Sequence, residues 1–300
     1  MERNDKMEKI RFAHLADTHL CREGKASFLD IPVRENFEKA IDYFCGLHNK
    51  PEFVVVTGDV VNDGDLEDYR FAKTFIEKMQ QKLGAPIFLA IGNHDDRANF
   101  FEGYLGTDAQ PSYCYPKNIN GLRLIVLDSA NGDVNGKIGP EQLSWLKKEL
   151  MKPAACGTVL AFHHPLAVDE FMLGEHCLED AEDLYAVIRG TDVVGVLTGH
   201  THRSNQSIVL DNVLSVTADS VAYSLDVNGD DVKMTERFGF NMLTVMDKTM
   251  YNSTVQVGSE TVIGRYSLSG MMDMIQKMTQ EPGLTMDGME AFEKFIRGEK

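Results

Sequence analysis

Residue types that bind metal ions follow a series of apolar segments along this chain. The segments end in Asp17-Thr18-His19, Gly58-Asp59, Gly92-Asn93-His94-Asp95, His163-His164 and Gly199-His200-Thr201-His202. In open α/β sheets, sites form just beyond the carboxyl ends of strands, so we expect these side chains to meet at one edge. Residues i and i+2 of an extended segment point the same way, which lets both members of an Asp-x-His or His-x-His pair face one centre.

The candidate ligands combine imidazole and carboxylate groups, a mixture that suits zinc, iron or manganese better than calcium or magnesium. Seven ligands are too many for one tetrahedral ion, but they suit two ions that share a carboxylate and leave positions open for water and substrate. Two ions about 3.5–4 Å apart can clamp the attacking and leaving oxygens of a phosphoryl displacement. The chemistry that we expect is therefore hydrolysis of a phosphate ester.

Taken in order, these motifs resemble those of the calcineurin-like metallophosphoesterase superfamily over residues 17–202. Local features are similar to those of bacterial class III cyclic-nucleotide phosphodiesterases and glycerophosphodiesterases. These features are the acidic turn 62–65, the triplet Leu127-Asp128-Ser129 and the segment 139–150. The resemblance implies a two-sheet β-sandwich flanked by helices in four layers, and hydrolysis of a small phosphodiester by a hydroxide that bridges two metal ions.

The resemblance also implies which residues hold the two ions. The first ion would be bound by Asp17, His19 and His202, and the second by Asn93, His163 and His200. Asp59 would bridge them. The motif His-x-Pro selects His163 over His164 as the ligand.

Three further roles at the substrate follow from the same resemblance. His94 would sit beside the phosphate, where it stabilises developing charge or protonates the leaving oxygen, and Asp95 is a candidate to orient its ring. Asn93 and His164 would also face the substrate. The loops 96–104 and 165–176 and the C-terminal segment are expected to build the rest of the substrate pocket.

The elements that must position these residues alternate between strands and helices. Apolar runs rich in valine, isoleucine and leucine predict buried strands over residues 10–16, 53–57, 87–91, 122–127, 158–162 and 193–198. Apolar residues at helical spacing predict helices over residues 37–45, 72–83, 140–150 and 268–278, and the acidic run 179–183 predicts another helix start. This alternation is typical of an α/β architecture.

After Gly199 the pattern changes to short apolar runs with turns between them. The runs 207–210, 213–216, 240–246 and 253–257 predict a second, more antiparallel sheet. We expect a catalytic domain over residues 1–265 and a short helical C-terminal extension over 266–300. The methionine-rich part of this extension would pack against the sheet, act as a lid or form a homodimer contact.

Composition excludes some partners and favours others. The net charge of −16 over 300 residues, without a basic stripe, disfavours a nucleic-acid polymer. No segment has the roughly 18 consecutive apolar residues of a membrane span, and the first residues do not resemble a signal peptide, so we expect a cytoplasmic protein. The five scattered cysteines predict reduced thiols.

Several less specific interpretations also have to be considered. His14, His48 and His176 are more simply surface or packed histidines, and Asp128 is expected to cap a loop. Alternative functions are a phosphomonoesterase, a nuclease of the same superfamily, or a non-catalytic scaffold that binds a protein through its C-terminal extension. Such scaffolds typically lose ligands, whereas every expected ligand type is present here.

Overall fold

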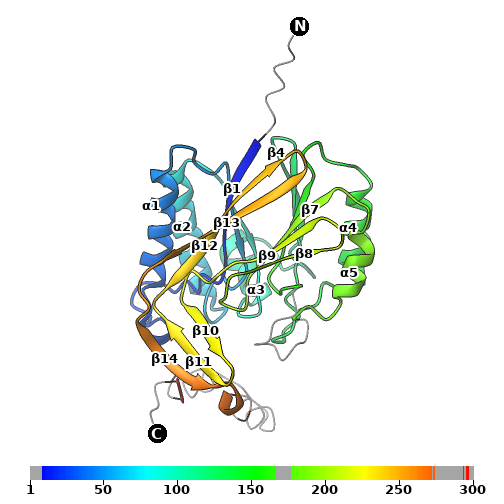
Figure 1. Ribbon diagram of the computed structural model, residues 1–300. Helices are drawn as coiled ribbons and strands as arrows, with labels where there is room; N and C mark the ends of the chain where they lie inside the picture. Colours follow the sequence, from blue (N-terminus) through cyan, green and yellow to red (C-terminus); the bar gives the residue numbers. More distant parts are fainter. Residues whose placement is uncertain (1–8, 167–176, 272, 274–292, 294, 297–300) are drawn as a thin grey trace.

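Two β-sheets stacked face to face form the centre of the computed structural model, which describes residues 9–166, 177–271, 273, 293 and 295–296 (Figure 1). The first sheet has the strand order β13-β12-β1-β2-β3, and the second has the order β4-β5-β6-β7-β9-β8. The strands of the first sheet are β1 (Lys9–Leu15), β2 (Val54–Thr57), β3 (Ile87–Ala90), β12 (Phe238–Met246) and β13 (Thr249–Val257). Those of the second are β4 (Tyr115–Ile119), β5 (Leu122–Val126), β6 (Thr158–Ala161), β7 (Val193–Thr198), β8 (Asn205–Val209) and β9 (Val213–Thr217).

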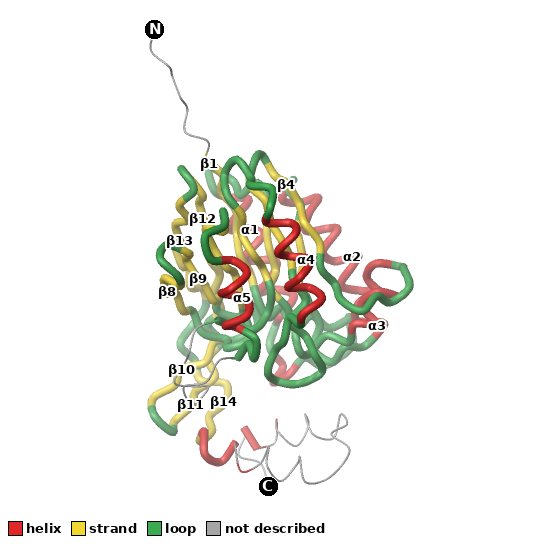
Figure 2. Tube along the Cα trace, turned by 90° about the vertical axis from the view of Figure 1, so that its right-hand side faces the viewer, coloured by secondary structure: helices red, strands yellow, loops and turns green. Residues whose placement is uncertain are grey.

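Helices cover the outer face of each sheet. α1 (Val33–Gly46) and α2 (Leu66–Leu83) pack on the first sheet, and α4 (Pro140–Leu150) and α5 (Ala181–Ile188) pack on the second. Figure 2 looks at the side on which α4 and α5 lie. A third apolar cluster fills the space between the two sheets. The order helix, sheet, sheet, helix is the four-layer sandwich that the resemblance implies.

The helices begin and end at residues that suit helix termini. At the start of α2, the Asp65 side chain accepts a hydrogen bond from the backbone N–H of Glu67, and Gly84 ends the helix in the left-handed region. α4 begins with Pro140 at its first position. Asp180 precedes α5, and Glu182 and Asp183 lie in its first turn, which confirms the helix start predicted there.

A third, smaller sheet lies below β12 in the view of Figure 1. It is antiparallel and consists of β10 (Ser224–Asn228), β11 (Asp231–Thr235) and β14 (Val262–Ser267). The prediction of one second antiparallel sheet after Gly199 is therefore wrong. β8 and β9 extend the second sheet, because β9 pairs in parallel with β7, and β12 and β13 extend the first, because β12 pairs with β1. Apolar periodicity indicates a strand but not its partner.

The remaining predictions of elements match the structure closely. All six predicted strands and the helices over 37–45, 72–83 and 140–150 are present, with strand ends within one residue. Two short helical segments, α3 (Arg97–Asn99) and η2 (Phe100–Leu105), follow β3. Residues 268–271 are helical, but most of the C-terminal extension lies outside the described residues and β14 continues across residue 265, so the division there stays a prediction. No helix within the described part of the chain could span a membrane.

Candidate metal centre

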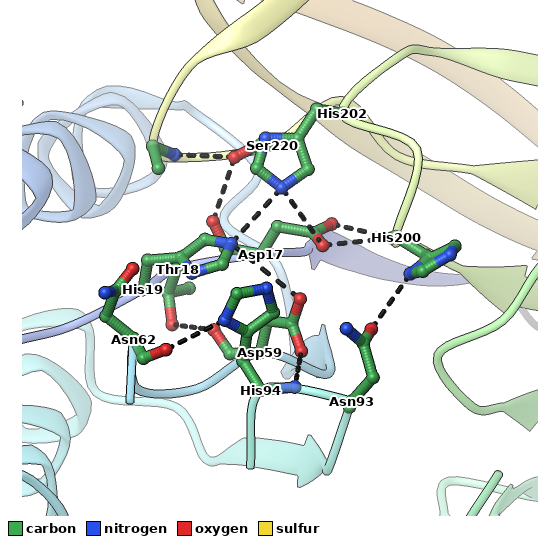
Figure 3. A network of polar contacts seen from close by, with 12 residues as sticks. Asp17, Thr18, His19, Asp59, Asn62, Asn93, His94, His200, His202 and Ser220 are labelled. Carbon is green, nitrogen blue, oxygen red and sulfur yellow. Dashed lines mark hydrogen bonds and ion pairs between the residues drawn. The ribbon is translucent and has the colours of Figure 1, made fainter. Parts of the chain in front are cut away.

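The predicted ligands meet at one edge of the sandwich, beyond the carboxyl ends of strands from both large sheets (Figure 3). β1, β2 and β3 of the first sheet and β6 and β7 of the second each lead into this edge. The residues that follow them are Asp17, His19, Asp59, Asn93, His94, His163, His200 and His202. Two separate sheets thus contribute side chains to a single centre.

Asp17, His19 and His202 form one group whose ligand atoms all lie within 4.8 Å of one another. The Nε2 atoms of His19 and His202 are 3.2 Å apart, and His202 Nε2 is 3.5 Å from Asp17 Oδ1. His202 Nδ1 is 3.1 Å from the backbone carbonyl of Tyr223, which can only accept a hydrogen bond. The neutral His202 ring therefore carries its proton on Nδ1 and turns the lone pair of Nε2 toward this group.

A second group brings together Asn93, His163 and His200. Asn93 Oδ1 lies 2.9 Å from His163 Nε2 and 3.0 Å from His200 Nδ1, and these two nitrogens are 3.2 Å apart. His163 Nδ1 donates to the backbone carbonyl of Thr57 at 2.9 Å, which turns Nε2 toward Asn93 and His200. An amide oxygen and two imidazole nitrogens that converge in this way are atoms of the types that bind transition-metal ions. The donor chemistry of both groups therefore fits bound metal ions.

Asp59 lies between the two groups. Its Oδ2 is 3.4 Å from His163 Nε2 and 3.8 Å from His19 Nε2, while Oδ1 accepts the backbone N–H of His94 at 2.9 Å. Burial raises the pKa of Asp59, but the neighbouring imidazoles His163 and His94 lower it more, so that the pKa lies well below its usual range. Burial lowers the pKa of His163, but the Asp59 carboxylate outweighs this and raises it to about 9. The centre thus favours positive charge next to an ionised Asp59.

The backbone of the centre is strained at most of the predicted ligands. Five of the seven have positive φ angles between 42° and 76°, in a region that residues other than glycine rarely adopt. They are Asp17, His19, Asp59, His200 and His202. Each such residue costs of order 1–3 kcal/mol, and such strain clusters at functional sites. The strain therefore marks the same edge that the motifs predict.

The glycines next to the ligands leave room for ligand side chains. A Cβ atom at Gly92 would overlap with Asp59 Oδ1 and would lie 2.5 Å from the Asp59 backbone nitrogen. A Cβ atom at Gly199 would lie 2.6 Å from Asp17 Oδ2. Gly58, which precedes Asp59, has a φ of 82° and lies against the His163 ring. At these glycines the backbone therefore approaches the ligand side chains closely.

His94 is held beside the first group, but not by the residue that the sequence suggests. Its ring lies 4.9 Å from the His19 ring, and its Nδ1 is 2.8 Å from the backbone carbonyl of Asn62. The expected orienting role of Asp95 is not supported by this geometry. The Asp95 carboxylate is buried and accepts hydrogen bonds from three backbone amides and from the Tyr69 hydroxyl. Burial and the nearby Asp59 charge raise its pKa to about 6.

The other singled-out residues have structural surroundings. His164 is buried, with Nδ1 2.8 Å from Ser129 Oγ and its ring 4.7 Å from that of His200. His14 is buried in β1, as expected, and burial lowers its pKa to about 3. Asp128 accepts hydrogen bonds from the Tyr113 and Ala130 backbone amides and the Arg97 side chain, which confirms its loop-capping role. The exposed His48 lies apart, and His176 falls outside the described residues.

Two residues that help to position the ligands, Ser220 and Tyr223, belong to no sequence motif that could have predicted this role. Ser220 Oγ donates to the Asp17 backbone carbonyl at 2.9 Å and accepts the backbone N–H groups of Ala222 and Tyr223. The Tyr223 carbonyl holds His202, and its ring lies 4.3 Å from the His202 ring. Both residues belong to an irregular segment after β9 that matches no ligand motif. Only the fold brings this segment to the centre.

Comparisons with known proteins agree with this geometry. The family model for the calcineurin-like phosphoesterases matches residues 10–204. A probable cyclic nucleotide phosphodiesterase of Rhodococcus erythropolis is 33% identical, with 84% of this chain and 85% of the relative covered. A cAMP/cGMP dual-specificity phosphodiesterase of Mycobacterium tuberculosis is 32% identical over 86% and 82% of the two chains. A glycerophosphodiester phosphodiesterase GpdQ of Enterobacter lignolyticus is 31% identical over 63% and 70%.

Solved structures support the fold at low sequence identity. A purple acid phosphatase from yellow lupin (Lupinus luteus) matches with a TM-score of 0.56 and 14% identity, covering 87% of this chain and 54% of the other. A dimetal phosphatase from Danio rerio matches with a TM-score of 0.53 and 14% identity, covering 83% and 99%. With its family model spanning most of the sandwich and relatives above 30% identity, this chain belongs to the calcineurin-like phosphoesterase family.

Proposed function

We propose that this chain is a dinuclear, metal-dependent phosphodiesterase that hydrolyses small phosphodiesters, with cyclic nucleotides as its first substrates. The observation that carries the proposal is the position of Asp59, whose carboxylate lies within 4 Å of histidines from both ligand groups. A shared carboxylate between two groups suits a pair of ions. The relatives at 32–33% identity, which are named as cyclic nucleotide phosphodiesterases, support the choice of substrate.

In this proposal, Asp17, His19 and His202 hold the first ion, Asn93, His163 and His200 hold the second, and Asp59 is shared. Manganese, iron and zinc all suit this set of imidazole, carboxylate and amide ligands. Bound there, two cations would polarise a phosphoryl oxygen and make water a better nucleophile near neutral pH. We propose that the ions are held this way because the ligand atoms of both groups already converge.

The side chains around the ions have separate tasks. Because Nδ1–H donates to the Asn62 carbonyl, Nε2 can protonate the leaving oxygen when His94 is an imidazolium, in which both ring nitrogens carry a proton. Asn93 turns Oδ1 toward His163 and His200, which leaves its Nδ2 amide to donate to a phosphoryl oxygen. We propose that His164, next to the His200 ring, forms part of the same substrate wall. Asp95 positions the loop between β3 and His94 rather than the His94 ring itself.

A substrate profile tests the proposal. Protein reloaded with manganese, iron or zinc is assayed against 3′,5′-cyclic AMP, glycerophosphocholine and 4-nitrophenyl phosphate, with DNA and RNA as polymeric substrates. We expect the cyclic nucleotide to be cleaved with the highest kcat/KM and the polymers not to be cleaved. A preference for glycerophosphocholine would favour the second candidate, which the GpdQ relative suggests. Cleavage of the monoester alone would refute the diesterase assignment.

We also propose that the protein works in the cytoplasm. None of the five cysteines, all of which lie in the described part of the chain, takes part in a disulfide, as expected for a reducing compartment. A homodimer through the C-terminal extension is proposed as well, and sedimentation of the full chain and of a chain ending after β14 tests it. An unchanged monomeric mass in the full chain would contradict it.

A further inference from the structure

Tyr223 forms an aromatic wall beside the candidate metal centre. Its ring lies 4.3 Å from the His202 ring, 6.4 Å from the His19 ring and 6.0 Å from the Phe28 ring, measured between centroids. Tyr223 is partly exposed, so its ring is not entirely covered by the protein. No motif and no proposed ligand role accounts for an aromatic side chain at this position.

The backbone of Tyr223 is fixed independently of its side chain. Its N–H donates to Ser220 Oγ at 3.3 Å, and its carbonyl accepts the Nδ1–H of His202 at 3.1 Å. These bonds tie the position of the ring to that of a proposed ligand. They also survive when the side chain is replaced, so a variant at this position tests the ring alone.

The centre has a polar end and an apolar end. On the apolar side, Tyr223 and Phe28 pack against the cluster that joins the small sheet to the segment around η1 (Phe28–Asp30). The His19 ring also neighbours the His94 ring, 4.9 Å away in an edge-to-face arrangement, and the His94 backbone N–H donates to Asp59 Oδ1. Because the His19 ring neighbours both rings, we place the organic group of a ligand whose phosphate contacts His94 beside Tyr223.

From this arrangement, and resting on the proposed function, we infer that Tyr223 determines substrate specificity by stacking on the nucleobase of a cyclic nucleotide. Every nucleobase presents a flat face that stacks on an aromatic side chain, whatever its hydrogen-bonding edge. A glycerophosphodiester has no such face. The ring would thus favour nucleotides over aliphatic diesters without contacting the reacting atoms, and Phe28 would support it from the apolar side.

The test compares ligands with and without a base on manganese-loaded protein. Titration calorimetry measures the Kd of 5′-AMP and of inorganic phosphate, and kinetics measure KM and kcat for cyclic AMP and glycerophosphocholine. Tyr223→Leu keeps apolar volume but removes the ring, whereas Tyr223→Phe keeps the ring. Tyr251→Ala, at an exposed tyrosine on the edge strand β13, is the matched control.

We expect Tyr223→Leu to weaken 5′-AMP binding and to raise the KM of cyclic AMP, each about tenfold. Phosphate binding and glycerophosphocholine turnover should change less than about twofold, as should every value for Tyr223→Phe and Tyr251→Ala. Equal losses for 5′-AMP and phosphate, or no loss for either, would overturn the inference. A wild-type protein that cleaves neither diester would instead refute the proposed function. The two outcomes are distinguishable, because the binding of 5′-AMP and phosphate tests the Tyr223 ring without any turnover.

Discussion

Replacing Gly92 by alanine tests whether the close packing around Asp59 sets the geometry of the centre. The added Cβ would overlap with Asp59 Oδ1 and would lie 2.5 Å from the Asp59 backbone nitrogen and 2.9 Å from His163 Cδ2. The φ angle of Gly92 lies outside the left-handed region, so alanine meets no backbone penalty there. Any loss therefore comes from the displacement of Asp59 and His163.

The size of the effect follows from the overlap. Carbon atoms in good contact lie about 3.5 Å from their neighbours, so the Asp59 backbone must move by roughly 1 Å. A displacement of about 1 Å in an active site can cost on the order of a hundredfold in rate, or about 2.7 kcal/mol of transition-state stabilisation. Overpacking of this kind also lowers the free energy of unfolding by about 1–3 kcal/mol.

Gly46→Ala is the matched control. Gly46 is the last residue of α1, its φ is not positive, and a methyl group added there would meet no atom within 4 Å. Hydrolysis of bis(4-nitrophenyl) phosphate, metal content and urea unfolding are measured for both variants at equal metal concentration. We expect Gly92→Ala to lose activity and metal while Gly46→Ala matches the wild type. Activity of Gly92→Ala within about threefold of wild type would refute the idea that the Asp59 position limits the reaction.

Asp59→Asn removes the shared charge, so metal content and hydrolysis should fall together. The loss should exceed the roughly 10- to 100-fold that replacing an outer hydrogen-bond partner of a ligand costs. Normal turnover would contradict the two-ion proposal. His94→Ala should spare metal content and lower kcat about 10²- to 10⁴-fold, and loss of metal would show that its role is misassigned. Asp219 is buried, and burial raises its pKa to about 6, so its carboxylate form destabilises the folded state. The free energy of unfolding of the wild type should therefore fall relative to that of Asp219→Asn as the pH rises from about 4 to about 6, by at most about 3 kcal/mol, and the difference should stay constant above that. Urea unfolding at pH 4 and at pH 8 measures it, and the same difference between the two proteins at both pH values would contradict this.

Residue types and their order predict the ligand positions because each ligand follows a buried, easily recognised strand. The same reasoning places Asp128 in a loop-capping role and His14 in the core. It fails for strand pairing, since β12 pairs with β1 across more than 200 residues of sequence, and β13 pairs with β12. It also misses the contact of His94 with Asn62, because a backbone carbonyl leaves no mark in the residue type.

The Asp95 correction has the same physical origin. An acidic residue next to a histidine in sequence suggests a pair, but successive side chains in such a turn need not point the same way. Here three backbone amides and a tyrosine hydroxyl compete for the Asp95 carboxylate and hold it in the interior. A buried carboxylate gains more from several fixed donors than from one partly buried imidazole. Local sequence cannot show this competition, because Val60, Val61 and Tyr69 come from another part of the chain.

The hydrogen bonds of the centre also connect the two large sheets. His163 follows β6 of the second sheet and donates to the Thr57 carbonyl in β2 of the first. The His200 backbone N–H, after β7, donates to both carboxylate oxygens of Asp17, after β1, each at 3.0 Å. Ligands on each sheet are therefore positioned by groups of the other, and the His200–Asp17 bonds join two ligands with strained backbone. A change in how the two sheets stack must therefore move the ligands.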